Sequence, residues 1–186
     1  GVPPLESLEE LLLARSVTFG DFTLSSGRRS SFYVDARKTT MSALGQRLIG
    51  VLGLGLIRAR GWLPAAAGGL TMGADPVAYA IARASLDDPP VIDAFSVRKT
   101  AKAHGTRRPI EGNFDPGAAV VVVEDVITTG GSALAAIEAV RSGGGTVVGV
   151  LSVVDREEGG AARILESGIE VVSITTISRL IPPRRG

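Results

Sequence analysis

The chain has 186 residues with 20 basic and 19 acidic side chains, so its formal charge is only +1. This length suits one compact domain, and the balanced charge gives no strong field toward nucleic acid or an anionic membrane. The absence of cysteine excludes disulfides, thiolate-bound metals and a thiol nucleophile, and the single histidine excludes a site with several histidine ligands. No segment has the pattern of a signal peptide or a membrane span, so we expect a cytoplasmic protein.

The first forty residues do not show the strand–helix alternation of the rest of the chain. Apolar spacing predicts an amphipathic helix over 5–14, and two short strands are predicted within 19–36 around a Ser-Ser-Gly-Arg turn. A second helix is predicted over 41–60. We expect residues 1–40 to form a small cap on the edge or the carboxyl ends of a sheet. Residues 41–186 are expected to form the core, in one compact unit with the cap.

From residue 64 onward, predicted strands alternate with helices. A helix running to about residue 85 is expected to begin with Asp75 as its N-cap and Pro76 in its first position. Residues 98–114 have no apolar period and are predicted to be a loop. The alternation predicts an α/β fold with a parallel sheet. The strands are expected at 64–69, 90–97, 118–123, 146–154 and 170–177, and further helices at 132–142 and 161–166.

Residues 120–134 read VVVVEDVITTGGSAL and form the most informative segment. A buried strand is predicted to end in Glu124 and Asp125, followed by a loop over 126–132 and a helix. Backbone N–H groups, loop hydroxyls and a helix N-terminus around one point suit a phosphate monoester. Two carboxylates beside such a site suit the hydroxyls of an attached ribose, or Mg²⁺. Two other phosphate-loop patterns, GxxxxGK[ST] and GxGxxG, are absent, so we predict binding of a ribose 5-phosphate.

The loop over 98–112 is the second informative segment. Its donors suit a polyphosphate, which offers many acceptor oxygens, although a solvated basic loop has the same composition. Gly105 and Gly112 are candidate hinges. The donors are Arg98, Lys99, Lys102 and His104.

Segment 120–134 resembles the phosphoribosyl-pyrophosphate (PRPP) motif of type I phosphoribosyltransferases. Further segments resemble the orotate phosphoribosyltransferases over residues from about 5 to about 180: FGDFTLSSGR from 19, SFYVDAR from 31, GLTMGADP from 69, RKxxKxHG from 98, and Asp155-Arg156. The resemblance implies a type I phosphoribosyltransferase fold with an N-terminal hood. It also implies a reaction in pyrimidine biosynthesis, in which orotate and PRPP give orotidine 5′-monophosphate and pyrophosphate.

The same resemblance implies roles for individual residues. Lys102, His104 and Asp125 would be catalytic, and Thr128, Arg156 and Tyr33 would bind orotate. Mg²⁺ would be carried mainly by PRPP, without a direct protein ligand. The implied partners are the two small substrates, with no nucleic acid or membrane, and loop 98–112 would act across a homodimer interface. The residues implied for PRPP are Arg98, Lys99, Lys102, His104, Glu124, Asp125, Val126, Ile127, Thr128, Thr129, Gly130, Gly131 and Ser132.

The chain departs from the family pattern at two places. Thr71 and Met72, in the loop implied to bind pyrophosphate, stand where some members have an aromatic residue and a lysine. Ser25 stands where some members have a lysine, so a cationic contact is missing there.

Two other functions stay open at this point. One is a phosphoribosyltransferase for a purine or uracil, which Arg156 argues against because a neutral base has no carboxylate to pair with it. The other is a regulator of the same fold without turnover. A DNA-binding regulator usually needs an added helix-turn-helix domain, for which this chain has little length or charge.

Overall fold

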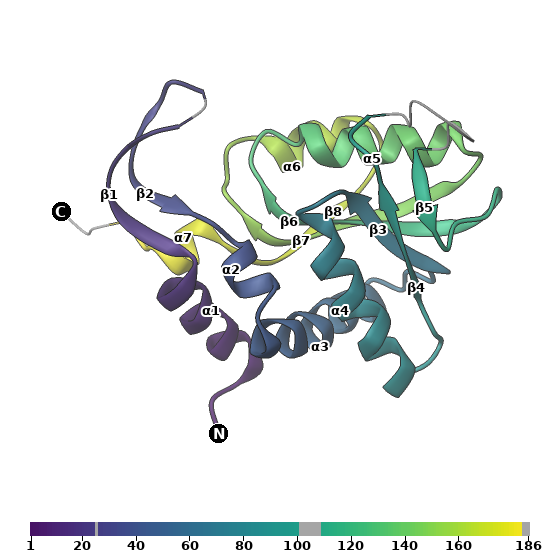
Figure 1. Cartoon of the computed structure of the whole chain (residues 1–186), viewed down its shortest axis with the longest axis horizontal. Coiled ribbons are helices and arrows are strands. Elements are labelled where there is room, and N and C mark those ends of the chain that lie inside the picture. Colours follow the sequence, from purple (N-terminus) through teal and green to yellow (C-terminus); the bar gives the residue numbers. More distant parts are fainter. Residues whose placement is uncertain (25, 101–108, 184–186) are drawn as a thin grey trace.

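A central sheet in the order β5-β4-β3-β6-β7-β8 organises the computed structural model, which describes residues 1–24, 26–100 and 109–183 (Figure 1). All neighbouring strands are parallel except β5, which runs antiparallel to β4. A separate hairpin, β1-β2, stands beside this sheet. The strands are β1 (Val17–Thr23), β2 (Arg29–Val34), β3 (Ala66–Leu70), β4 (Asp93–Val97), β5 (Ile110–Gly112), β6 (Ala119–Ile127), β7 (Thr146–Asp155) and β8 (Val171–Thr176).

Helices cover both faces of the sheet, as the alternating sequence predicts. In Figure 1, α5 (Gly131–Ser142) and α6 (Gly160–Glu166) lie on one side, and α3 (Ala43–Ala59) and α4 (Ala74–Asp87) lie on the other. Three further helices are α1 (Pro4–Arg15), α2 (Arg37–Thr40) and α7 (Ile177–Leu180). No helix within the described ranges is long and apolar enough to cross a bilayer.

Strand β6 divides the hydrophobic core in two. Val121 and Val123 pack with the residues of α3 and α4, whereas Val120 and Val122 pack with the residues of α5. Successive side chains of a strand point to opposite faces, so an unbroken run of valines contributes side chains to both halves of the core.

The N-terminal forty residues share this core. Leu8 and Leu12 of α1 are fully buried in the cluster that contains α3 and α4. The turn of the β1-β2 hairpin contains Gly27 with φ +82°, a left-handed conformation that glycine adopts without strain. Helix α1 is therefore packed on the core, and the β1-β2 hairpin meets the carboxyl ends of the sheet at a shared cavity.

Three predicted elements differ from the structure. The helix predicted over 41–60 begins two residues later, as α3, because the Ser42 side chain accepts a hydrogen bond from the N–H of Gly45 and caps it, and the short helix α2 precedes it without having been predicted. Asp75 does not cap α4: the helix begins one residue earlier, after Gly73, and the Asp75 carboxylate accepts hydrogen bonds from the hydroxyls of Thr71 and Ser96. The predicted loop over 98–114 contains β5, whose pairing with β4 depends on tertiary contact rather than on an apolar pattern.

Candidate active site

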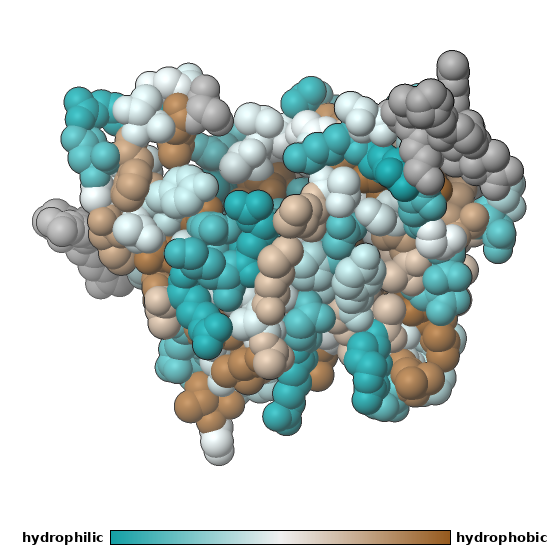
Figure 2. Space-filling view, viewed as in Figure 1, coloured by the Kyte–Doolittle hydropathy of each residue, from teal (hydrophilic) through white to brown (hydrophobic). Residues whose placement is uncertain are grey.

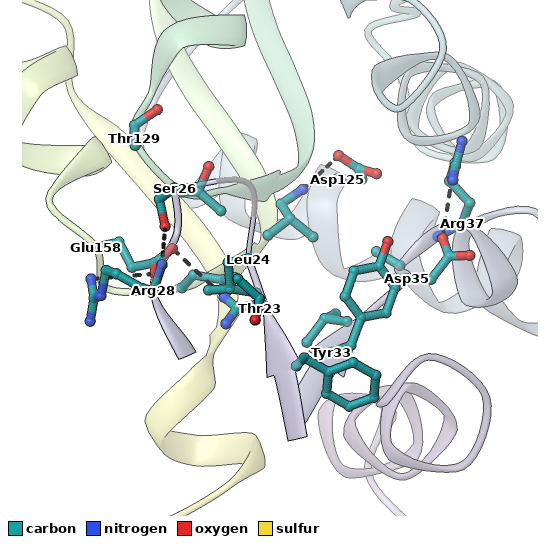
Figure 3. A pocket seen from close by; sticks show the side chains of 16 residues that line it. Thr23, Leu24, Ser26, Arg28, Tyr33, Asp35, Arg37, Asp125, Thr129 and Glu158 are labelled. Atoms are coloured by element: carbon teal, nitrogen blue, oxygen red, sulfur yellow. Dashed lines mark hydrogen bonds and ion pairs between the residues drawn. The ribbon is translucent and has the colours of Figure 1, made fainter. Parts of the chain in front are cut away.

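A cavity of about 900 Å³ lies where the hairpin meets the carboxyl ends of the sheet (Figure 3). Its lining comes from the hairpin and the residues after it (within 22–37), from the end of β6 and the loop that follows, and from Arg156 and Glu158 after β7. Ligands of open α/β sheets bind at this edge. Figure 2 shows hydrophilic residues gathered near α2, on the face turned toward the reader.

The two acidic residues of the phosphate-loop motif lie within β6 and not after it. The strand runs to Ile127, beyond both the predicted strand over 118–123 and the predicted end at Glu124 and Asp125, so those predicted ends are wrong and the connecting loop is shorter than 126–132. Parallel pairing with β7 carries the strand onward, since Val126 is in register with Val154 and Ile127 with Asp155. Glu124 and Asp125 consequently lie on opposite faces of the sheet.

Glu124 is buried, and its Oε1 atom has no hydrogen-bond partner among the described residues. Burial, with a smaller contribution from the neighbouring Asp125 charge, raises the pKa of Glu124 to about 8. This carboxyl is therefore protonated in the free protein at neutral pH, and it lines a second cavity, on the α5 side.

Asp125 faces the large cavity. Burial raises the pKa of the Asp125 carboxyl, whereas the backbone N–H of Val126 and the charge of Arg37 lower it. The Val126 N–H donates to Asp125 Oδ1 at 2.7 Å. Figure 3 shows Asp125 on the same side of the cavity as Asp35 and Arg37, and the Tyr33 hydroxyl points toward that side.

The loop between β6 and α5 encloses the second cavity, of about 270 Å³. Gly130 precedes α5 with φ +87°, and a Cβ there would lie 3.0 Å from the carbonyl oxygen of Gly160, so a larger residue does not fit. Gly131 has open space, because a Cβ would meet only Thr129 Oγ1 at 3.9 Å. The two cavities share Val126, Thr128 and Thr129, so the predicted phosphate loop joins them. The second cavity is lined by Glu124, Val126, Ile127, Thr128, Thr129, Gly130, Gly131, Ser132 and Ala133.

Arg156 follows β7 at the opposite side of the large cavity. Its side chain is only 9% exposed, and its guanidinium lies 4.9 Å from the centre of the Phe32 ring. Its ion pair with Glu158 is 3.8 Å long, beyond hydrogen-bond distance, and no other described group accepts a hydrogen bond from the guanidinium. A nearly buried cation whose donors are unused is suited to a carboxylate ligand.

The remaining predicted residues are only partly described. Arg98 donates twice to Glu111 Oε1, at 3.0 and 2.8 Å, across the β4-β5 pair, and Lys99 is exposed at the start of the loop. Lys102, His104 and Ser25 lie outside the described residues. No group of three or more acidic or histidine side chains in the described ranges could hold a metal ion.

Sequence reasoning assigned no role to four charged residues that line the cavity: Arg28, Asp35, Arg37 and Glu158. Asp35 and Arg37 fall within a quoted family segment, which could have drawn attention to them. Arg28 likewise ends the family segment that begins at residue 19, whereas Glu158 lies in none, and only the fold brings the hairpin turn close to the loop after β7.

No protein-family model matches the chain. Curated relatives are nevertheless similar over nearly its whole length. Orotate phosphoribosyltransferase of Aquifex aeolicus is 48% identical over 179 residues, which is 95% of this chain and 97% of the relative. The enzyme of the same name from Mycobacterium avium is 47% identical over 96% of this chain and 97% of its own length. The chain belongs to the orotate phosphoribosyltransferase family.

Solved structures agree with this membership. A crystal structure of Mycobacterium tuberculosis orotate phosphoribosyltransferase in complex with Fe(III) dicitrate superposes with a TM-score of 0.86 at 47% identity, covering 96% of this chain and 99% of that one. A complex of the same enzyme with PRPP gives a TM-score of 0.82 at 43% identity, covering 96% and 99%. The predicted α/β type I phosphoribosyltransferase fold is confirmed, and as an orotate phosphoribosyltransferase the chain is a pentosyltransferase.

Proposed function

We propose that this chain transfers the 5-phosphoribosyl group of PRPP to orotate, giving orotidine 5′-monophosphate and pyrophosphate in pyrimidine biosynthesis. Membership of the family supports the reaction class. The observation that carries the substrate assignment is the charge arrangement of the large cavity. At one side of it lies Arg156, a nearly buried guanidinium from which no described residue accepts a hydrogen bond, and a phosphate-type loop opens at another side.

The 5-phosphate binds in the second cavity. Its donors are the backbone N–H groups at the start of α5 and the hydroxyls of the loop, and the open space at Gly131 lets the phosphate approach the backbone. The hydroxyls are those of Thr128, Thr129 and Ser132.

The ribose lies at the junction of the two cavities. Asp125 accepts hydrogen bonds from ribose hydroxyls on the large-cavity side, and Glu124 does so from the α5 side. A protonated Glu124 presents a neutral group to the dianionic phosphate, and hydroxyl donors from the ribose then favour its ionised form.

The base occupies the large cavity. The Arg156 guanidinium pairs with the orotate carboxylate, Thr128 lies between base and ribose, and Tyr33 contacts the base from the cavity wall. A base without a carboxylate leaves the cation unpaired in this nearly buried position, which disfavours uracil and purines.

Catalysis consists of positioning and charge stabilisation. As the bond between C1 and pyrophosphate breaks, positive charge grows on the ribose ring and negative charge on the leaving oxygen. Asp125 stabilises the former, and Arg98, Lys99, Lys102 and His104 stabilise the latter. Mg²⁺ enters with PRPP as part of the substrate and neutralises pyrophosphate charge.

The expected cytoplasmic location of the protein stays a prediction.

The basic loop acts in trans, within a homodimer. Arg98, held to Glu111 beside β4, anchors the start of the loop at the sheet, and Lys99, the next residue, is exposed. Mixing inactive Lys102→Ala with inactive Asp125→Asn tests this. Restored activity after subunit exchange supports a shared site, and none despite confirmed exchange contradicts it.

Replacement of the carboxylate-binding cation tests the substrate assignment. Arg156→Met keeps the apolar stem over Phe32 but removes the charge. We expect kcat/KM for orotate to fall at least a hundredfold. Steady-state assays that follow orotate absorbance measure this, and a fall of less than threefold contradicts the assignment.

A further inference from the structure

Arg28 lies in the hairpin turn, at the side of the large cavity where Arg156 is found. A hydrogen bond from the Leu24 N–H to the Arg28 carbonyl, at 2.8 Å, closes the turn and fixes the position of its backbone. The Arg28 guanidinium pairs with Glu158 Oε1 at 3.7 Å. Figure 3 shows Arg28 and Glu158 together, away from Asp125 and Arg37.

Glu158 thus lies between two arginines. Its Oε2 faces Arg156 at 3.8 Å, and its Oε1 faces Arg28 at 3.7 Å. Both separations exceed hydrogen-bond distance, so neither guanidinium has its donors satisfied by this carboxylate. Arg28 and Arg156 together with Glu158 have a net charge of +1, which one further carboxylate would neutralise.

Arg29, the next residue along the hairpin, provides a comparison, because a neighbouring carboxylate accepts hydrogen bonds from its guanidinium. Arg29 donates to Asp21 through both Nε, at 3.3 Å, and Nη2. Arg29 does not line the cavity, whereas Arg28 does. Arg28, just before β2, and Arg29, its first residue, therefore differ in whether a described carboxylate accepts hydrogen bonds from the guanidinium.

Resting on the proposed function, we infer that Arg28 is a second cation for the carboxylate of the pyrimidine substrate, acting with Arg156 at the same side of the cavity. Glu158 positions both guanidiniums before the substrate arrives.

The kinetic consequence is specific to one substrate. Arg28 is 72% exposed at its side chain, so its contact with the carboxylate is partly screened by solvent. Removal of one charge-assisted contact at such a position raises the KM for orotate roughly fivefold to tenfold. The KM for PRPP should change less than twofold, because PRPP binds at the other end of the site.

Three variants of the full chain test the inference: Arg28→Ala, Arg29→Ala as the matched control, and Glu158→Gln. We expect only Arg28→Ala to raise the KM for orotate fivefold or more, and Arg29→Ala to match the wild type. Glu158→Gln removes the same ion pair but keeps the cation, so it should raise this KM less than Arg28→Ala. The wild-type KM for orotate should also rise more steeply with ionic strength than that of Arg28→Ala.

The outcomes separate this inference from the function on which it rests. If the wild type turns over orotate and Arg28→Ala has the same KM as Arg29→Ala, the inference is overturned and the function stands. If Arg28→Ala and Glu158→Gln raise the KM for orotate equally, Arg28 acts only through its ion pair with Glu158, and the inference is overturned as well. A wild type that does not turn over orotate contradicts the proposed function, and this inference with it.

Discussion

Gly73 and Asp125 approach so closely that a Cβ on Gly73 would lie 2.8 Å from Asp125 Oδ1. Gly73 immediately precedes α4 and has φ −59°, a conformation that alanine adopts freely. The need for glycine at this position therefore comes from the carboxylate beside it and not from the backbone.

Gly73→Ala should fold normally but displace the Asp125 carboxylate from the site of the ribose. We expect kcat/KM for PRPP to fall at least tenfold, since small displacements of a positioning group have large kinetic effects. Steady-state kinetics and a thermal melt check the two parts. Activity within twofold of the wild type would show that Asp125 does not need this position.

Gly131→Ala separates ligand binding from packing at the phosphate loop. Because a Cβ at Gly131 meets no protein atom closer than 3.9 Å, the variant should be as stable as the wild type. The KM for PRPP should rise about tenfold or more, because the methyl group occupies the space that the phosphate needs. An unchanged KM for PRPP would place the phosphate elsewhere.

Two glycines of α3 should respond to alanine in opposite directions. A Cβ on Gly55 meets nothing within 4 Å, so Gly55→Ala should stabilise the protein by about 0.5–1 kcal/mol through better helix propensity. A Cβ on Gly50 would lie 2.6 Å from the Ala80 carbonyl oxygen on α4, and Gly50→Ala should destabilise by about 1–3 kcal/mol. Urea unfolding of both variants measures the two changes in the free energy of unfolding. If both changes had the same sign, the prediction would be wrong.

Glu124 gives the stability of the free protein a specific pH dependence. The unfolded chain ionises this carboxyl above its ordinary pKa of 4.5, whereas the folded protein retains the proton up to about pH 8. Between these values the folded state binds more protons, so this residue lowers the free energy of unfolding as the pH rises.

Glu124→Gln lacks this titration and serves as the control. The stability of the wild type minus that of the variant should decrease from pH 4.5 to about pH 8 and stay level outside that interval. Denaturant unfolding of both proteins at several pH values gives the difference. A constant difference would mean that Glu124 is ionised in the folded protein.

Local pattern was enough to predict most of the fold. The valine run of β6 and the apolar spacing of α1 and α5 each carry their own signal, and the alternation of strands and helices fixes a parallel sheet. The short strand β5 could not be predicted, because its three residues are held by pairing with β4 rather than by an apolar pattern. Asp75 was misassigned because its carboxylate has partners in Thr71 and Ser96, the second of which lies 21 residues away.

The candidate site likewise contains parts that the local sequence predicts and parts that depend on tertiary contacts. The phosphate loop could be predicted because its residues are contiguous in the sequence. The orotate contact of Arg156 was indicated only by the family resemblance. The opposite orientation of Glu124 and Asp125 depends on how far β6 continues, which its pairing with β7 decides. The approach of Arg28 to Glu158 joins positions 130 residues apart, so no local pattern contains it.

The most direct test of the account mixes purified protein with Mg²⁺, PRPP and one base at a time, and follows the consumption of the base. We expect turnover of orotate with release of pyrophosphate, and kcat/KM for uracil and hypoxanthine lower by at least a thousandfold. Turnover of uracil or hypoxanthine with none of orotate, or turnover of no base at all, would contradict it.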